Sequence, residues 1–241
     1  MLIFSIAVVL VVLIGCGGGG AVPGAPARPA PVPVSFYGDS ILSGSIKRSK
    51  GDGTHRDAWL MPRPVERINE LAQGRIAGVD WSVPGATVQD ARDGTPGMPF
   101  GPFAQAIQGD TSRVVVIGYA TANALRYPNA LVEYQTTLAA MVRQAQIAGM
   151  RVLLLGAPHL AMPAGDLSPD DSAALAMRLA RFDDATKDVA NKTGARFIDL
   201  RSVAFFGAAD MADDVHPDQL YSDRLGALVA REVVAVVQAL P

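Results

Sequence analysis

The sequence predicts an α/β domain in which helices cover both faces of a five-stranded parallel sheet, a three-layer α/β/α sandwich. Short aliphatic and β-branched runs alternate with longer amphipathic segments along the chain. Two of these runs, VVVIG and LLLG, are apolar at every position, as is typical of strands buried on both faces of a parallel sheet. The alternation implies right-handed crossovers between parallel strands. The predicted strands span residues 32–37, 76–81, 113–118, 151–156 and 195–200.

Three segments between and after these strands have clear helical signals. Residues 130–148 place Leu131 and Leu138 on one apolar stripe. A second helix is expected to begin after Ser168, because this N-cap candidate is followed by a proline and two acidic residues. The last helix is predicted over residues 222–240 from its repeated apolar positions.

The chain begins with an apolar run, LIFSIAVVLVVLIG, that is too short to cross a bilayer comfortably and fits the core of a signal peptide. The run leads into Cys16, and the sequence Leu-Ile-Gly-Cys resembles the lipobox of bacterial lipoproteins. That resemblance implies that residues 1–16 are a signal segment and that Cys16 is lipidated. It also implies an exported protein of the bacterial cell envelope, held as an outer-membrane lipoprotein that faces the periplasm or the surface. An uncleaved signal anchor is the alternative, because no Lys or Arg precedes the run.

Residues 17–33, GGGGAVPGAPARPAPVP, are expected to form a linker, because this composition cannot bury a core. The four glycines are not followed by the Lys-Ser/Thr pair of a phosphate loop. The folded domain is therefore predicted over residues 34–241, an ordinary size for one domain.

Composition excludes several classes of function. The 21 Lys and Arg against 23 Asp and Glu give a net charge of −2, without the basic patch that a nucleic-acid partner requires. The single cysteine excludes an intrachain disulfide framework and a cysteine-rich metal site.

In an open parallel sheet, ligands bind beyond the carboxyl ends of the strands, so the residues that follow each strand are the ones to inspect. Ser40 follows the first strand in Gly-Asp-Ser, where its hydroxyl could be exposed and its N–H could face an oxyanion; alternatively, Asp39 or Ser40 only caps a helix. Gly85 could bring a backbone N–H close to a carbonyl oxygen or could be an ordinary turn glycine. Asn123 could donate to a tetrahedral intermediate or could stabilise its own loop.

The chain contains three histidines. His216 lies three residues after Asp213, so that a carboxylate could hold one ring nitrogen while the other faces a serine hydroxyl. His159 follows the fourth strand and is the competing base. His55 lies in a segment, 47–57, that is expected to form a charged loop, so its side chain is expected to be solvated.

Together these segments resemble the SGNH hydrolases, also called GDSL esterases and lipases, over the domain from about residue 34 to the last helix. Gly38-Asp39-Ser40 matches the nucleophile block of the family, residues 82–87 (SVPGAT) resemble its glycine block, and residues 213–217 (DDVHP) resemble its last block. The asparagine block departs from the family pattern. Aligned without a gap, Ala122 occupies the place of the oxyanion asparagine and Asn123 replaces the aspartate that follows it.

The resemblance implies a flavodoxin-like fold and a serine esterase that needs no metal or organic cofactor. Ser40 would be the nucleophile, His216 the base and Asp213 the residue that orients it, while Ser40, Gly85 and Asn123 would form the oxyanion hole. The substrate would be an acyl or acetyl ester of a lipid or a glycan. Two alternatives stay open: an acyltransferase with the same triad, and a catalytically impaired glycan-binding domain of the envelope.

Overall fold

The computed structural model describes residues 29–49, 55–95, 97–159 and 168–241. The expected signal segment, Cys16 and most of the linker lie outside the described residues. No helix in the described part of the chain is both long enough and apolar enough to span a membrane.

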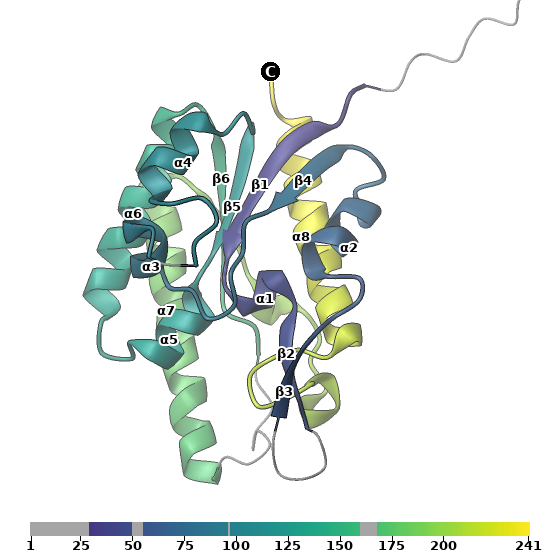
Figure 1. The fold of residues 1–241 in the computed structure, drawn as a ribbon, viewed down its shortest axis with the longest axis vertical. Coiled ribbons are helices and arrows are strands. Elements are labelled where there is room, and N and C mark those ends of the chain that lie inside the picture. Colours follow the sequence, from purple (N-terminus) through teal and green to yellow (C-terminus); the bar gives the residue numbers. More distant parts are fainter. Residues whose placement is uncertain (1–28, 50–54, 96, 160–167) are drawn as a thin grey trace, which may run out of the picture.

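The five predicted strands form one sheet, in the order β4-β1-β5-β6-β7 (Figure 1). Every neighbouring pair is parallel, so the predicted five-stranded parallel sheet is confirmed. The central strand β5 is buried at every position and β1 over its last five residues, which explains why these segments contain no charged residue. The strands are β1 (Val32–Gly38), β4 (Ile76–Asp80), β5 (Val114–Gly118), β6 (Arg151–Leu155) and β7 (Arg196–Ile198).

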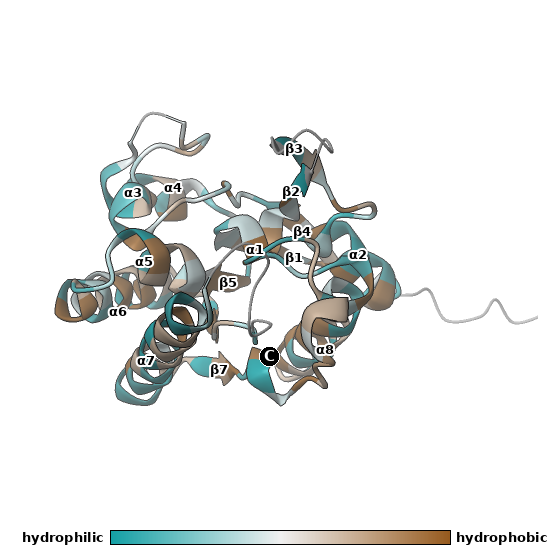
Figure 2. Cartoon of the chain, turned by 90° about the horizontal axis from the view of Figure 1, so that it is seen from below, coloured by the Kyte–Doolittle hydropathy of each residue, from teal (hydrophilic) through white to brown (hydrophobic). Residues whose placement is uncertain are grey.

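Helices cover both faces of the sheet, as a three-layer sandwich requires (Figures 1 and 2). One face packs on α3, α4, α5, α6 and α7, and its core includes Phe103, Leu138 and Phe182. The other face packs on α2 and α8, with Ile68 and Val233 in its core. The bounds are α1 (Ser40–Ser43), α2 (Pro64–Leu71), α3 (Val88–Asp93), α4 (Phe103–Gly109), α5 (Ala120–Arg126), α6 (Leu131–Ile147), α7 (Pro169–Thr193) and α8 (Gln219–Gln238), with short 3-10 helices at Leu200–Ser202 and Gly207–Asp210.

The predicted helices agree with α6, α7 and α8. Ser168 caps α7 as expected, because its side chain accepts a hydrogen bond from the Asp171 N–H. The last helix begins earlier than residue 222, since Asp218 acts as its N-cap and accepts from the Tyr221 N–H at 2.7 Å.

Two expectations about the first third of the chain are corrected. The linker ends sooner than residue 33, because Val32 and Pro33 already belong to β1 and pair with β4. The charged segment 47–57 is not a simple loop: β2 (Ser45–Ser49) and β3 (His55–Trp59) form an antiparallel hairpin. Figure 1 shows this hairpin beyond the carboxyl ends of β1 and β5, next to α1.

Candidate active site

The first functional segment is the turn between β1 and α1. Asp39 is buried and caps α1, because its Oδ1 accepts from the Ile41 N–H at 3.0 Å while its Oδ2 accepts from the Ala122 N–H at 2.9 Å. Burial raises the pKa of Asp39 to about 6, although these two hydrogen bonds act in the opposite direction. The cap role therefore belongs to Asp39, and Ser40 is the first residue of the helix.

Gly38 lets the turn form where two strands end side by side. A Cβ at this position would lie 2.6 Å from the Gly118 carbonyl oxygen and 2.7 Å from the Leu42 side chain. Gly38 and Gly118 are partners in the β1–β5 pairing, so the close backbone approach fixes where Ser40 leaves the sheet.

The segment before α8 folds as a tight loop that places His216 beside Asp213. Met211 and Pro217 close the loop with an isolated bridge. Asp213 Oδ1 accepts from the backbone N–H of Val215 at 2.9 Å and of His216 at 2.8 Å, which turns the chain back on itself. His216 Nδ1 lies 2.8 Å from Asp213 Oδ2.

The other ring nitrogen of His216 reaches the opposite end of the chain. Its Nε2 lies 2.8 Å from Ser40 Oγ, a contact between residues 176 positions apart. Ser40 is 9 % exposed, so its hydroxyl is largely shielded from water. The structure thus brings the three residues Ser40, His216 and Asp213 into one hydrogen-bonded line.

The β2–β3 hairpin adds a contact that the sequence does not reveal. The backbone N–H of Lys47 donates to Asp213 Oδ2 at 2.6 Å. Burial would raise the pKa of Asp213, but the hydrogen bonds from His216, Lys47 and Val215 outweigh burial and lower the pKa to about 2. Asp213 is therefore a carboxylate throughout the neutral range. No side-chain pattern could have signalled this contact, because the donor is a main-chain group.

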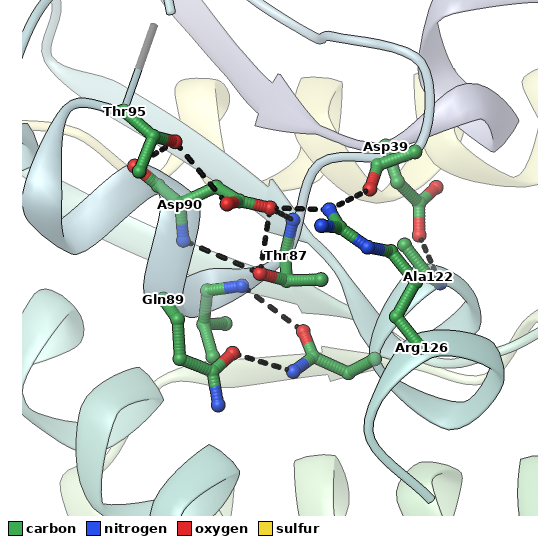
Figure 3. Close-up of polar contacts among 10 residues, drawn as sticks. Asp39, Thr87, Gln89, Asp90, Thr95, Ala122 and Arg126 are labelled. Carbon is green, nitrogen blue, oxygen red and sulfur yellow. Dashed lines mark hydrogen bonds and ion pairs between the residues drawn. The ribbon is translucent and has the colours of Figure 1, made fainter.

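The expectation that Asn123 belongs to an oxyanion hole is not supported. Asn123 is completely buried, its Oδ1 accepts from the Val88 N–H at 3.0 Å, and its Nδ2 donates to Gln89 Oε1 at 2.8 Å (Figure 3). The amide is thereby used to hold the start of α3. These contacts favour the gapless alignment, in which Ala122, without a polar side chain, stands where the family asparagine would be.

Two backbone donors are available in the same region. Ser40 lies at the N-terminus of α1 and Gly85 in the loop after β4, and neither N–H donates to another group of the described residues. Gly85 adopts a φ of 72°, which favours glycine. The carbonyl oxygen of Gly85 accepts a hydrogen bond from Arg126 Nη1 at 2.9 Å. The sequence gives no signal for this contact with Arg126.

The competing histidine, His159, does not contact Ser40. His159 Nε2 lies 2.9 Å from the Arg201 carbonyl oxygen, and its ring stacks on Phe205 with a centroid separation of 5.5 Å. The competing base is thus used in a structural contact. His55 begins β3, but its side chain lies outside the described part of the structure. Among described residues, no three His, Cys, Asp or Glu side chains gather as a metal site would require.

Comparisons with known proteins identify the family and the fold. Residues 36–224 match the model of the GDSL-like Lipase/Acylhydrolase family. No curated protein matches the sequence.

Solved structures with the same fold include three bacterial proteins. A carbohydrate acetylesterase from Sinorhizobium meliloti superposes with a TM-score of 0.66 at 17% identity, over 85% of this chain and 99% of that one. The aryl esterase of M. smegmatis gives 0.66 at 14% identity, with coverages of 85% and 99%. A lipase/acylhydrolase from Enterococcus faecalis gives 0.60 at 19% identity, with coverages of 85% and 96%. The chain belongs to the GDSL-like lipase/acylhydrolase family and is a carboxylic ester hydrolase.

Proposed function

We propose that the protein hydrolyses carboxylic esters through an acyl-enzyme formed on Ser40. The observation that carries this proposal is the 2.8 Å contact between Ser40 Oγ and His216 Nε2, continued by the 2.8 Å contact between His216 Nδ1 and Asp213 Oδ2. A nucleophile within hydrogen-bond reach of a base, which a third group orients, is the arrangement that activates a serine hydroxyl.

The proposed reaction has two halves. Ser40 Oγ attacks the ester carbonyl while its proton passes to His216 Nε2, and the imidazolium then protonates the departing alcohol. Water next attacks the acyl-enzyme while His216 Nε2 takes its proton, and the imidazolium then returns that proton to Ser40 Oγ as the bond to the acyl group breaks and the carboxylic acid departs. Asp213 keeps the proton on Nδ1, so that Nε2 is free to accept, and stabilises the imidazolium that forms in each half.

The tetrahedral intermediates would be stabilised by the N–H groups of Ser40 and Gly85. Because Ala122 replaces the side-chain donor of the family, the oxyanion hole has backbone donors only. Removing one donor from an oxyanion hole lowers turnover by roughly 10²–10³-fold in other enzymes. We therefore expect a functional but slow esterase.

The proposed substrate is an acyl or acetyl ester of a lipid or a glycan. Both kinds of ester are named among the similar structures, which include a carbohydrate acetylesterase and a lipase/acylhydrolase. Screening acetylated oligosaccharides against medium-chain acylglycerols would separate the two classes.

The purified chain is expected to hydrolyse p-nitrophenyl acetate, and Ser40→Ala and His216→Ala should each remove this activity. His159→Ala is the matched control, because that ring contacts the Arg201 carbonyl and not Ser40. Equal rates for the wild type and Ser40→Ala would contradict the proposal. A burst of nitrophenol followed by turnover only when an acceptor alcohol is added would indicate an acyltransferase instead.

We also propose that Cys16 carries a lipid that tethers the exported domain to the cell envelope. The support is the lipobox-like Leu-Ile-Gly-Cys and the linker that follows it. Metabolic labelling with a palmitate analogue should mark the wild type and spare Cys16→Ser. Equal labelling of the two proteins would contradict lipidation at this position.

A further inference from the structure

In the turn from Val83 to Ala86, Ala86 is buried in the core, but Gly85 itself is held by hydrogen bonds and not by packing. Gly85 is exposed, and a Cβ built on it would meet no atom within 4 Å. The Ala86 N–H donates to the Val83 carbonyl at 3.1 Å, and the φ of 72° after Pro84 is that of a type II turn. An exposed glycine in such a turn can redirect its N–H unless another contact prevents it.

Arg126, the last residue of α5, provides that contact. Its Nη1 donates to the Gly85 carbonyl at 2.9 Å and to Asp90 Oδ2 at 2.7 Å (Figure 3). The peptide that joins Gly85 to Ala86 is consequently fixed at both ends, since its carbonyl accepts from Arg126 and its N–H donates to Val83. Only the φ and ψ torsions of Gly85 then lie between this fixed peptide and the Gly85 N–H.

Asp90 anchors the guanidinium of Arg126 to α3. Asp90 Oδ2 accepts from the Thr87 N–H at 2.9 Å and from the Thr87 hydroxyl at 2.8 Å, and Asp90 Oδ1 accepts from Thr95 at 3.1 Å. Burial would raise the pKa of Asp90, but the Thr87 hydrogen bonds and the charge of Arg126 outweigh it and lower the pKa. The carboxylate is therefore charged at neutral pH and holds Arg126 in place.

We propose that Arg126 is a positioning residue that aims the Gly85 N–H at the oxyanion, with Asp90 as its anchor. The proposal rests on the esterase mechanism above, in which Gly85 is an oxyanion donor. The orientation of the Gly85 N–H matters more here than in an oxyanion hole with three donors. Ala122 contributes no side-chain donor, so a misdirected Gly85 N–H would leave the Ser40 N–H as the single donor to the oxyanion. A displacement of about 1 Å at a reacting centre can cost on the order of 10²-fold in rate.

The test compares Arg126→Ala with Arg92→Ala in the full-length protein. Arg92 is a matched control, because it is also a half-exposed arginine in this region and pairs with Asp93 and Glu133 without touching Gly85. With p-nitrophenyl acetate, Arg126→Ala should lower kcat by roughly 10–100-fold and change KM by less than about twofold. Arg92→Ala should leave both constants within about twofold of the wild type.

Two further measurements separate positioning from a general structural effect. Phenylboronic acid forms a tetrahedral adduct with a nucleophilic serine, so its inhibition constant should rise in Arg126→Ala and stay constant in Arg92→Ala. Added guanidinium ion should restore part of kcat in Arg126→Ala only. Arg126→Lys, which keeps the charge but lacks the planar fork, should show a smaller loss that guanidinium does not repair.

The outcomes distinguish this inference from the proposed function. If Ser40→Ala is as active as the wild type, the esterase mechanism itself fails. If activity depends on Ser40 while Arg126→Ala and Arg126→Lys match Arg92→Ala in kcat and in boronate inhibition, Arg126 does not position Gly85. If Arg126→Ala does not fold, Arg126→Lys is the variant that tests the inference. A kcat of Arg126→Lys equal to that of the wild type would then overturn the inference.

Discussion

Two adjacent residues, Ala122 and Asn123, distinguish the proposed oxyanion hole from the pattern of the family. Asn123 has the right side chain for an oxyanion donor, but its amide is buried and bonded to Val88 and Gln89 at the start of α3. A buried amide without these partners would cost about 1–3 kcal/mol, so the fold strongly favours this use of Asn123. Ala122 is 4% exposed and has only its N–H, which donates to Asp39.

Ala122→Asn should therefore raise kcat, because it returns a side-chain donor to the position that the family motif assigns to it. We expect an increase of at least about tenfold, given that one such donor is worth roughly 10²–10³-fold. Steady-state hydrolysis of p-nitrophenyl acetate measures the effect, and Ala122→Leu controls for side-chain volume. A folded Ala122→Asn protein that is no faster than the wild type would contradict the two-donor description.

Asp213 links the site to the pH dependence of stability. Its pKa lies near 2 in the folded protein against an ordinary value of 3.8, so the folded state favours the charged form. The stabilisation is fully present above about pH 4 and is lost as the pH falls through the folded pKa. At neutral pH the Asp213 carboxylate contributes about 2 kcal/mol to the free energy of unfolding, because each unit of pKa difference corresponds to about 1.4 kcal/mol.

Asp213→Asn should therefore lower the free energy of unfolding at pH 7, and the difference from the wild type should shrink between pH 4 and pH 2. Urea denaturation at a series of pH values measures this difference. The same variant should lose roughly 10⁴-fold in kcat, since an amide would favour the wrong tautomer of His216. A stability difference that stays constant down to pH 2 would show that the charge of Asp213 is not what stabilises the loop.

The β2–β3 hairpin is the element that completes the site from outside the sheet. Lys47 and Asp57 are partners in the hairpin, and the Lys47 N–H points out of the pair to Asp213. The exposed Lys47 side chain forms an ion pair with Asp57, which contributes little because both groups are solvated. The main-chain donor and the side chain of Lys47 can consequently be tested separately.

Lys47→Pro should reduce kcat by about tenfold, because it removes the N–H that stabilises the Asp213 carboxylate while keeping an extended backbone. Lys47→Ala removes only the exposed ion pair and should keep kcat within about twofold of the wild type. The test compares the hydrolysis rates of Lys47→Pro and Lys47→Ala, after circular dichroism has shown that each variant is folded. Equal rates for the two variants would mean that the Lys47 N–H does not assist Asp213.

The elements also show what the sequence can and cannot predict. The sequence predicts the five sheet strands to within a few residues, because runs such as VVVIG are short, rich in β-branched residues and apolar on both faces, as is typical of a buried strand. The hairpin is not predicted, because its strands, SIKRS and HRDAW, are short and charged and Ile46 is a single buried position without a repeating pattern. The pairing of Ser40 with His216 is predicted from the family blocks that contain the two residues. The contacts of Lys47 with Asp213 and of Arg126 with Gly85 involve main-chain groups, which residue types do not encode.

The whole molecule brings the two ends of the folded domain together at one site. Ser40 follows β1, which lies between β4 and β5, while His216 precedes α8, which packs against the opposite face of the sheet from α6. Their contact therefore depends on the complete sheet and on both helix layers. Since β1 begins at Val32 and pairs there with Ile76, the domain itself should not need residues 1–31.

A chain that starts at Val32 should fold and hydrolyse esters like the full-length protein, with a Tm within about 2 °C and kcat within about twofold. The physical reason is that this truncation removes no strand, helix or site residue of the described structure, and that residues 29–31 are exposed. Thermal unfolding and p-nitrophenyl acetate hydrolysis measure the two quantities. A chain that starts at Asp39 is the contrasting variant, because it lacks β1 and leaves β4 and β5 without the strand between them, so it should not fold. A large loss of stability or activity in the chain that starts at Val32 would show that the folded domain needs residues from the removed segment, 1–31.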